Sequence, residues 1–176
     1  MILVINTSSN GIDLLLDSKC IHVDAEKQAV GLPVAVNNLL QQNNVKMSDL
    51  SAIGVIVGPG SFTGIRMGIA YAKGLGIGLN IPVVPVNIFE LYLYETPDAF
   101  VAIDSGRGDF FVASKIHEPC TMNIDKVEIE QMKCPSTVGH KPYNLIFAKN
   151  IVENKIKNKI SEPVIPMYLR PSYAEK

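Results

Sequence analysis

The strongest constraint on this chain is an apolar run that enters a glycine loop and then a glycine-rich helix. The stretch GVIVGPGSFTGIRMGIAYAKGLGIG covers residues 54–78. The apolar run Ala52–Val57 predicts a buried strand, and Gly58 and Gly60 allow the sharp turn that follows it. The helix after the turn is predicted to end near Leu79. A strand joined to a helix by a tight loop is the building unit of α/β folds.

The surrounding segments extend this unit into a mixed sheet with helices. Ile2–Asn6 is a short apolar run typical of a central strand, and Gly11–Asp24 predicts two strands around a tight turn. Apolar residues at helical spacing predict a helix over Pro33–Asn44. The strand Ile81–Val86 and the helix Asn87–Glu95 follow, and the asparagine can cap that helix. The order βββ-α-β-α-β-α predicts an α/β fold.

The remaining sequence predicts a second, shortened lobe. We place the first lobe at residues 1–96 and the second at residues 97–176, with a basic segment and a C-terminal tail. Phe100–Ile116 predicts a hairpin with glycines in its turn, and the stretch MNIDKVEIE predicts one more strand. Periodicity is weak beyond Gln131, and the last sixteen residues hold three prolines, which favours an extended tail on the surface.

The charges are unevenly distributed along the chain. The net charge is −1, but residues 1–130 carry −6 and residues 131–176 carry +5. The Lys-rich segment Lys149–Lys159 has two interpretations, a surface that contacts tRNA or an ordinary solvated Lys-rich face. The chain is 47% hydrophobic, which is enough to build a core. The overall charge gives no argument for nucleic-acid binding.

Cysteine and histidine positions argue against disulfide and metal chemistry. The three cysteines form no CxxC pair, which favours reduced thiols in the cytoplasm. The three histidines lie far apart, so no helix offers two imidazoles to one metal, and we predict no metal site. The start MILVINTSS lacks the basic region of a signal peptide, and the longest uncharged apolar run is too short to cross a bilayer. We expect a cytoplasmic protein.

The glycine loop resembles phosphate-binding loops without matching one. The P-loop pattern fails because no Gly-Lys-Ser/Thr follows at the required spacing, and the dinucleotide pattern GxGxxG ends in Thr63. Exposed amides at a helix start still attract anions. The candidate anion-binding residues are Gly58, Gly60, Ser61, Thr63 and Arg66. The alternative is a tight strand-to-helix connection without a ligand.

Small residues recur every four positions along the predicted helix. Gly64, Gly68, Ala72 and Gly76 form a stripe that another element can approach closely. Each glycine costs about 1 kcal/mol of helix stability relative to alanine, so close packing must offset that cost. A second stripe is apolar and contains Phe62, Ile65 and Ile69. From the pattern alone, the small residues can face the protein's own sheet or another protein.

Four stretches of the chain, taken in order, resemble the TsaB (YeaZ-like) family of tRNA threonylcarbamoyladenosine biosynthesis proteins. The loop-helix stretch GPGSFTGIRMGIAYAKGLG is the most specific of them. The opening ILVINTSSNGIDLLLDSK, the hairpin FVAIDSGRGDFFVASK and the ending PMYLRPSYAEK are similar to the corresponding family segments. The resemblance covers Ile2 to about Ile116 and the tail, and it implies an actin-like (ASKHA, ribonuclease-H-like) fold.

The resemblance also implies partners. TsaB-like proteins are paralogues of the enzyme TsaD, which uses a metal and modifies an adenosine beside the anticodon of tRNA. They pair with TsaD, work with the ATPase TsaE, and pair with themselves when TsaD is absent. The family's pairing surface consists of two first-lobe helices, which here are Pro33–Asn44 and Phe62–Leu79. The residues predicted at this surface are Val36, Leu40, Phe62, Gly64, Ile65, Met67, Gly68, Tyr71, Ala72 and Leu75.

Departures from the family pattern bear on catalysis. TsaD-like enzymes place two histidines on one helix, and this chain has no histidine between His22 and His117. Asn6 stands where the family has an aspartate, and an amide lacks the anionic oxygen that a hard cation prefers. We therefore predict a non-catalytic scaffold without a cofactor of its own, with ATP or ADP at most at a partner interface. The alternative hypothesis is an ASKHA-type nucleotide phosphohydrolase or kinase that uses the Gly58–Thr63 loop.

Overall fold

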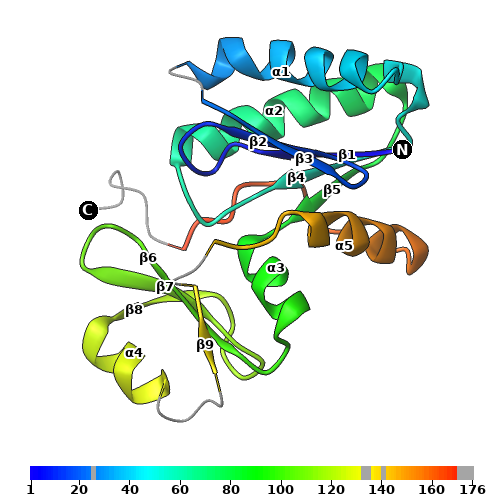
Figure 1. Cartoon of the computed structure of the whole chain (residues 1–176). Coiled ribbons are helices and arrows are strands. Elements are labelled where there is room, and N and C mark those ends of the chain that lie inside the picture. The colour runs from blue at the N-terminus through cyan, green and yellow to red at the C-terminus, as the bar shows by residue number, and fades with distance from the viewer. Residues whose placement is uncertain (25–26, 132–135, 140–141, 170–176) are drawn as a thin grey trace. The chain divides into compact units, whose positions relative to one another are not determined.

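The computed structural model describes residues 1–24, 27–131, 136–139 and 142–169, and it divides into two compact units (Figure 1). Unit 1 combines Met1–Val86 with Leu145–Pro166, and unit 2 combines Asn87–Asn144 with Met167–Lys176. This division differs from the predicted boundary at residue 96. Two helices account for the difference. The helix Ile146–Lys157 belongs to unit 1, and the helix Ile88–Glu95 belongs to unit 2.

Unit 1 is built on a five-stranded mixed sheet, as predicted. Its strands are β1 (Ile2–Asn6), β2 (Ile12–Leu16), β3 (Lys19–Val23), β4 (Ala52–Ile56) and β5 (Val83–Val86), in the order β3-β2-β1-β4-β5. The first three strands pair antiparallel, and β4 joins β1 and β5 in parallel. All residues of β1 and β4 are buried, as expected for central strands covered on both faces.

Helices cover both faces of this sheet. Helix α1 (Gln28–Gln42) and helix α2 (Phe62–Leu79) lie on one face and α5 (Ile146–Lys157) on the other (Figure 1). A short 3-10 helix, η1 (Met47–Asp49), precedes β4. Helix α1 begins before its predicted start at Pro33, which lies inside the helix with its ring exposed. The side chain of Gln28 fixes this earlier start by donating hydrogen bonds to the carbonyls of Ser9 (2.9 Å) and Gly11.

The small-residue stripe of α2 lies against the chain's own sheet. A Cβ atom at Gly64 would lie 2.0 Å from the Thr7 carbonyl oxygen, and one at Gly68 would lie 2.3 Å from Thr7 Oγ1. At Gly76 the added atom would lie 2.3 Å from a methyl group of Val83. These separations are shorter than any real contact, so the glycines let α2 approach β1 and β5 more closely than a larger residue would allow.

This packing corrects part of the predicted partner surface. Six of its residues are buried within unit 1, which leaves them unavailable to another protein: Val36, Leu40, Gly64, Ile65, Gly68 and Ala72. The pattern correctly identified a helix that is approached closely, but the approaching elements are the turn after β1 and the strand β5. The other four predicted residues, Phe62, Met67, Tyr71 and Leu75, are exposed or half-buried.

Most of the Lys-rich segment lies in α5, which packs against the sheet of unit 1. Its buried residues Ala148, Ile151, Val152 and Lys155 recur at helical spacing. The ammonium of Lys155 is buried and donates hydrogen bonds to the Pro85 carbonyl (2.9 Å) and to Glu162 (2.7 Å). Lys149 lies within ion-pair distance of Asp17 and Glu153. Two lysines of the predicted basic surface are thus engaged within the chain, which weakens the case for tRNA contact.

Unit 2 is a smaller sheet with two helices. It contains α3 (Ile88–Glu95), β6 (Phe100–Asp104), β7 (Asp109–Ala113), β8 (Cys120–Asn123), α4 (Ile124–Gln131) and β9 (Thr137–Val138), with strand order β8-β7-β6-β9. Asn87 caps α3 as predicted, because its side chain accepts the Glu90 N–H (2.9 Å). The hairpin is also confirmed, with Gly106 and Gly108 at positive φ.

One strand prediction in unit 2 is only partly right. The stretch MNIDKVEIE begins in β8 but continues as α4, because Asn123 accepts the Lys126 N–H (3.1 Å) at the helix start. The predicted surface tail has no regular secondary structure over residues 161–169, and its residues 170–176 lie outside the described part. Among the described residues, no helix is long and apolar enough to cross a membrane.

We expect glycine replacements on the two sides of α2 to have opposite effects on stability. Gly64→Ala forces a methyl group against the Thr7 carbonyl and should lower the free energy of unfolding by about 1–3 kcal/mol. Gly74→Ala, on the open side of the same helix, should raise it by about 0.5–1 kcal/mol. Urea denaturation of the two variants measures both changes. Equal effects of the two replacements would contradict the packing described here.

Candidate functional site

The glycine loop between β4 and α2 packs closely against the turn after β1. Gly58 and Gly60 have φ values of 125° and 154°, and the Gly58-Pro59 peptide bond is cis. A Cβ atom at Gly60 would lie 2.4 Å from the Ser8 carbonyl oxygen. The Ser61 N–H donates to that same oxygen at 2.6 Å. Glycine is needed at position 60 because two loops meet there.

The polar groups at the start of α2 are largely engaged within the chain. Ser61 caps the helix, because its Oγ accepts the Gly64 N–H (3.3 Å). The guanidinium of Arg66 lies 3.7 Å above the centre of the Phe62 ring. Thr63 is exposed. The five candidate anion-binding residues therefore lie together, but the Ser61 amide and hydroxyl already have protein partners.

Asn6 organises the turn that faces this loop. Its side chain is fully buried, and its amide donates to Asp13 (2.8 Å). Its carbonyl oxygen accepts hydrogen bonds from the Ser8 N–H (2.9 Å) and the Ser8 hydroxyl (2.7 Å). The amide thus closes the turn through neutral hydrogen bonds. The Asn6 carboxamide and the N–H and hydroxyl of Ser8 are thus engaged with one another and with Asp13 at this turn.

The same hydrogen-bond chain continues to the edge of the sheet. Asp13 lies 2.6 Å from His22 Nδ1, and His22 Nε2 lies 3.3 Å from Asp24. The hydrogen bond to Asp13, followed by that to Asp24, raises the pKa of His22. Both ring nitrogens therefore have carboxylate partners. Among the described residues, no three His, Cys, Asp or Glu side chains gather in a way that would hold a metal ion.

The outer face of α2 carries a second row of small residues. Ala70, Gly74 and Gly78 are exposed and spaced by four, and a Cβ atom at either glycine would meet nothing within 4 Å. Beside this row, Met67, Tyr71 and Leu75 form a half-buried apolar row with the same spacing. Partial burial raises the pKa of the Tyr71 hydroxyl. We call these six residues the outer α2 face.

Sequence reasoning missed part of this face. The spacing of Ala70, Gly74 and Gly78 was visible in the sequence, but the parallel row at Gly64, Gly68 and Ala72 has the same period. The two rows can be told apart only when it is known which of them packs against the sheet. The half-buried residues Met67, Tyr71 and Leu75 were predicted, and the structure brings them together beside the exposed small residues.

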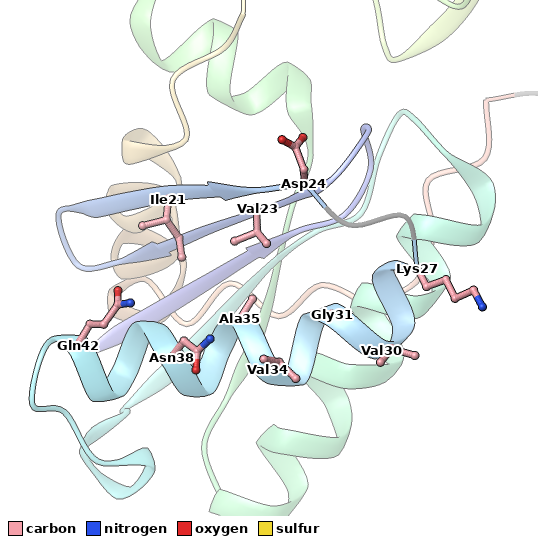
Figure 2. Close-up of a pocket in the computed structure, with 10 residues that line it drawn as sticks. All are labelled: Ile21, Val23, Asp24, Lys27, Val30, Gly31, Val34, Ala35, Asn38 and Gln42. Carbon is pink, nitrogen blue, oxygen red and sulfur yellow. The ribbon is translucent and has the colours of Figure 1, made fainter.

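A groove runs between α1 and the edge strand β3 (Figure 2). It encloses about 760 Å³. Ile21 and Val23 line it from the strand, and Val30 and Val34 line it from the helix, where they are 69% and 56% exposed. The remaining lining residues are Asp24, Lys27, Gly31, Ala35, Asn38 and Gln42. Sequence reasoning did not single out this groove, because alternating apolar residues of an edge strand look like those of any half-buried strand.

Comparisons with known proteins agree with this architecture. The family model of TsaD, tRNA N6-adenosine threonylcarbamoyltransferase, matches residues 23–167. The solved structure described as YeaZ from Pseudomonas aeruginosa superposes with a TM-score of 0.72 at 19% identity, covering 96% of this chain and 99% of that one. At that identity the likeness establishes the fold. It confirms the predicted actin-like fold.

Curated relatives fall into two groups. A tRNA N6-adenosine threonylcarbamoyltransferase of Thermosipho melanesiensis is 33% identical over 72 residues, which is 41% of this chain and 22% of the relative. TsaB proteins are 29% identical over 91 residues in Haemophilus influenzae and 45% identical over 56 residues in Bacillus subtilis. These two matches cover 47% and 32% of this chain.

The matched stretches span 38% of the Haemophilus protein and 24% of the Bacillus protein, well under two thirds of either relative. The family model, in contrast, extends over most of this chain. The chain therefore belongs to the TsaD family, as a TsaB-like (YeaZ-like) member with an actin-like fold.

Proposed function

We propose that this chain is a non-catalytic subunit that binds a TsaD-like enzyme through the outer α2 face and activates it in forming threonylcarbamoyladenosine next to the tRNA anticodon. The observation that carries the proposal is the exposed row of Ala70, Gly74 and Gly78 beside the half-buried row of Met67, Tyr71 and Leu75. Relatives named tRNA threonylcarbamoyladenosine biosynthesis protein TsaB support the biological role.

Helix stability supports a binding role for the outer face. Glycine in an exposed helix position costs about 1 kcal/mol relative to alanine, and no residue in the described part of the chain packs against Gly74 or Gly78 to offset that cost. The inner glycines of the same helix do have such packing. A partner helix seated over the exposed row can approach closely, because interaxial distance depends on the size of the side chains at the contact.

The neighbouring side chains fit the same role. Met67, Tyr71 and Leu75 offer apolar area at the edge of the small-residue row, and their half-burial leaves part of each side chain for a partner to cover. Aromatic residues and methionine are enriched in the centres of protein interfaces. Phe62, 50% exposed and stacked under Arg66, lies at the N-terminal end of the helix and extends the apolar surface.

The remaining assignments follow from this role. A TsaE-like ATPase is the proposed third component, and tRNA is reached only through the assembled complex in the cytoplasm. Without the enzyme, we propose that the chain pairs with itself. The isolated chain holds no nucleotide, and any ATP or ADP sits at the partner interface. The engaged groups around Asn6 and Ser61 do not favour an independent phosphohydrolase or kinase.

We expect Gly74→Leu to abolish activation of the enzyme without unfolding the chain. The leucine projects into solvent in the isolated protein, so far-UV circular dichroism and the unfolding midpoint should stay near those of the unmodified chain. It would separate the two helices in the complex. The measurement is threonylcarbamoyladenosine formed by the cognate TsaD-like enzyme and TsaE-like ATPase on tRNA, with each variant added.

A matched control is Lys157→Leu, which places the same side chain at an exposed position on α5, across the sheet from α2. It should leave activation intact. The activation assay is run without a large excess of the variant over the enzyme, so that a weakened complex is detected. Full activation by Gly74→Leu under this condition would contradict the assignment of the outer α2 face. Loss of activation by both variants would show a defect not specific to that face.

We expect ATP and magnesium to leave the thermal unfolding midpoint of the isolated chain unchanged. A ligand at one hundred times its dissociation constant would stabilise the protein by about 2.7 kcal/mol, which shifts a midpoint by several degrees. Differential scanning fluorimetry with and without ATP measures this directly. An unfolding midpoint that rises with ATP concentration, and no longer rises in Ser61→Ala, would support the alternative hypothesis of a nucleotide phosphohydrolase or kinase.

A further inference from the structure

Unit 2 brings a serine, a histidine and a glutamate within contact distance of one another. Ser114 follows the last residue of β7, and His117 closes the turn that begins at Ser114. Glu130 lies in α4, which packs against β7 (Figure 1). The Ser114 hydroxyl lies 3.0 Å from His117 Nδ1, and His117 Nε2 lies 3.5 Å from a carboxylate oxygen of Glu130. The imidazole therefore lies between a hydroxyl and a carboxylate.

The two neighbours of His117 define which of its nitrogens carries the proton in the neutral ring. An ionised carboxylate only accepts hydrogen bonds, so the proton that faces Glu130 is on Nε2. Nδ1 is then an acceptor, and the Ser114 hydroxyl donates to it. A serine whose hydroxyl donates to a histidine, with a carboxylate orienting the other side of that histidine, has the arrangement of an activated nucleophile.

Backbone amides direct the Ser114 proton toward the histidine. The N–H groups of Ile116 and His117 both donate to Ser114 Oγ, at 3.3 and 3.2 Å. These two bonds use the oxygen as an acceptor, which leaves its proton for His117 Nδ1. They also place the positive ends of two peptide dipoles at the oxygen that gains negative charge when the proton leaves. The turn thus favours removal of the proton from Ser114.

Packing holds the imidazole in place and leaves the hydroxyl within reach of solvent. The His117 ring meets the Phe100 ring edge to face, with the centroids 5.9 Å apart, and Phe100 belongs to the core of unit 2. The His117 side chain is only 23% exposed. Ser114 is half-buried, and the next two residues of the turn are exposed. A small reagent can therefore reach the Ser114 oxygen while the histidine keeps its orientation.

We propose that Ser114 is a base-activated hydroxyl that accepts an acyl group from activated carboxylic esters. The Ser114 oxygen attacks the carbonyl carbon, and His117 Nδ1 takes the hydroxyl proton. The bond between the carbonyl carbon and the ester oxygen then breaks, and the proton passes from Nδ1 to the departing oxygen. The products are acyl-Ser114 and an alcohol. A general base contributes about 10²–10⁴-fold to such a rate, which suits esters with a good leaving group rather than amides.

This site is independent of the proposed contact with the enzyme. Its three residues lie in unit 2, whereas the outer α2 face lies in unit 1. Ser114→Ala should therefore leave activation of the TsaD-like enzyme intact, and Gly74→Leu should leave acylation of Ser114 intact. Each proposal can fail without the other.

The test is incubation of the full chain with p-nitrophenyl acetate, followed by peptide mass spectrometry to locate the acetyl groups. Ser114 should be acetylated first, with release of an equal amount of p-nitrophenol. Ser105 of the same unit is the matched control, because its hydroxyl donates to the Asp109 carboxylate instead of a histidine. His117→Gln should slow acetylation of Ser114 by about 10²–10⁴-fold, because the amide cannot take the proton.

The pH dependence of the unmodified chain provides a second readout, which decides the question even where His117→Gln loses its fold. The rate of Ser114 acetylation should rise with pH as the imidazole loses its proton and should then level off. The proposal is overturned by acetylation of Ser114 no faster than that of Ser105, or by a rate that rises with hydroxide concentration without levelling off. It is also overturned by a folded His117→Gln variant that reacts at the rate of the unmodified chain.

Discussion

The contact between Thr7 and the first turns of α2 is the constraint on which the rest of unit 1 depends. The Thr7 hydroxyl donates to the Gly64 carbonyl at 2.7 Å, and the Thr7 backbone occupies the space where a side chain at Gly64 would begin. This approach holds α2 against β1 and brings the glycine loop within hydrogen-bond distance of Ser8. It also fixes the rotation of α2 about its axis, so the row of small residues on the opposite side must face outward.

The same contact brings the glycine loop into a hydrogen-bond network within the chain. Asn6, Ser8 and Ser61 satisfy one another, which makes the loop a structural junction between β1, β4 and α2. The Asn6 carboxamide stabilises this junction through its hydrogen bonds to Ser8 and Asp13. Among the described residues, α2 then exposes the small residues Ala70, Gly74 and Gly78, on which the proposed contact with the enzyme depends.

The sequence was sufficient to predict most of unit 1 because its elements are strongly patterned. The apolar strands, the α2 limits and the Asn87 cap all follow from local signals. It could not predict α5, because a lysine at position 155 makes the segment resemble a solvated surface. The hydrogen bonds that Lys155 donates to the Pro85 carbonyl and to Glu162 explain why a lysine is tolerated at this buried position. The sequence analysis named three residues of the outer α2 face, which is the pairing surface that we propose. Met67, Tyr71 and Leu75 were found, but two small-residue rows of equal period cannot be ranked without knowing which one the sheet occupies.

The most direct test of the central claim is hydrogen exchange of this chain, alone and bound to the TsaD-like enzyme. The account predicts slower exchange of the amides of residues 67–78 in the complex, with α5 and the hairpin of unit 2 unchanged. A complex that activates the enzyme while these amides exchange at the rate of the free chain would contradict it.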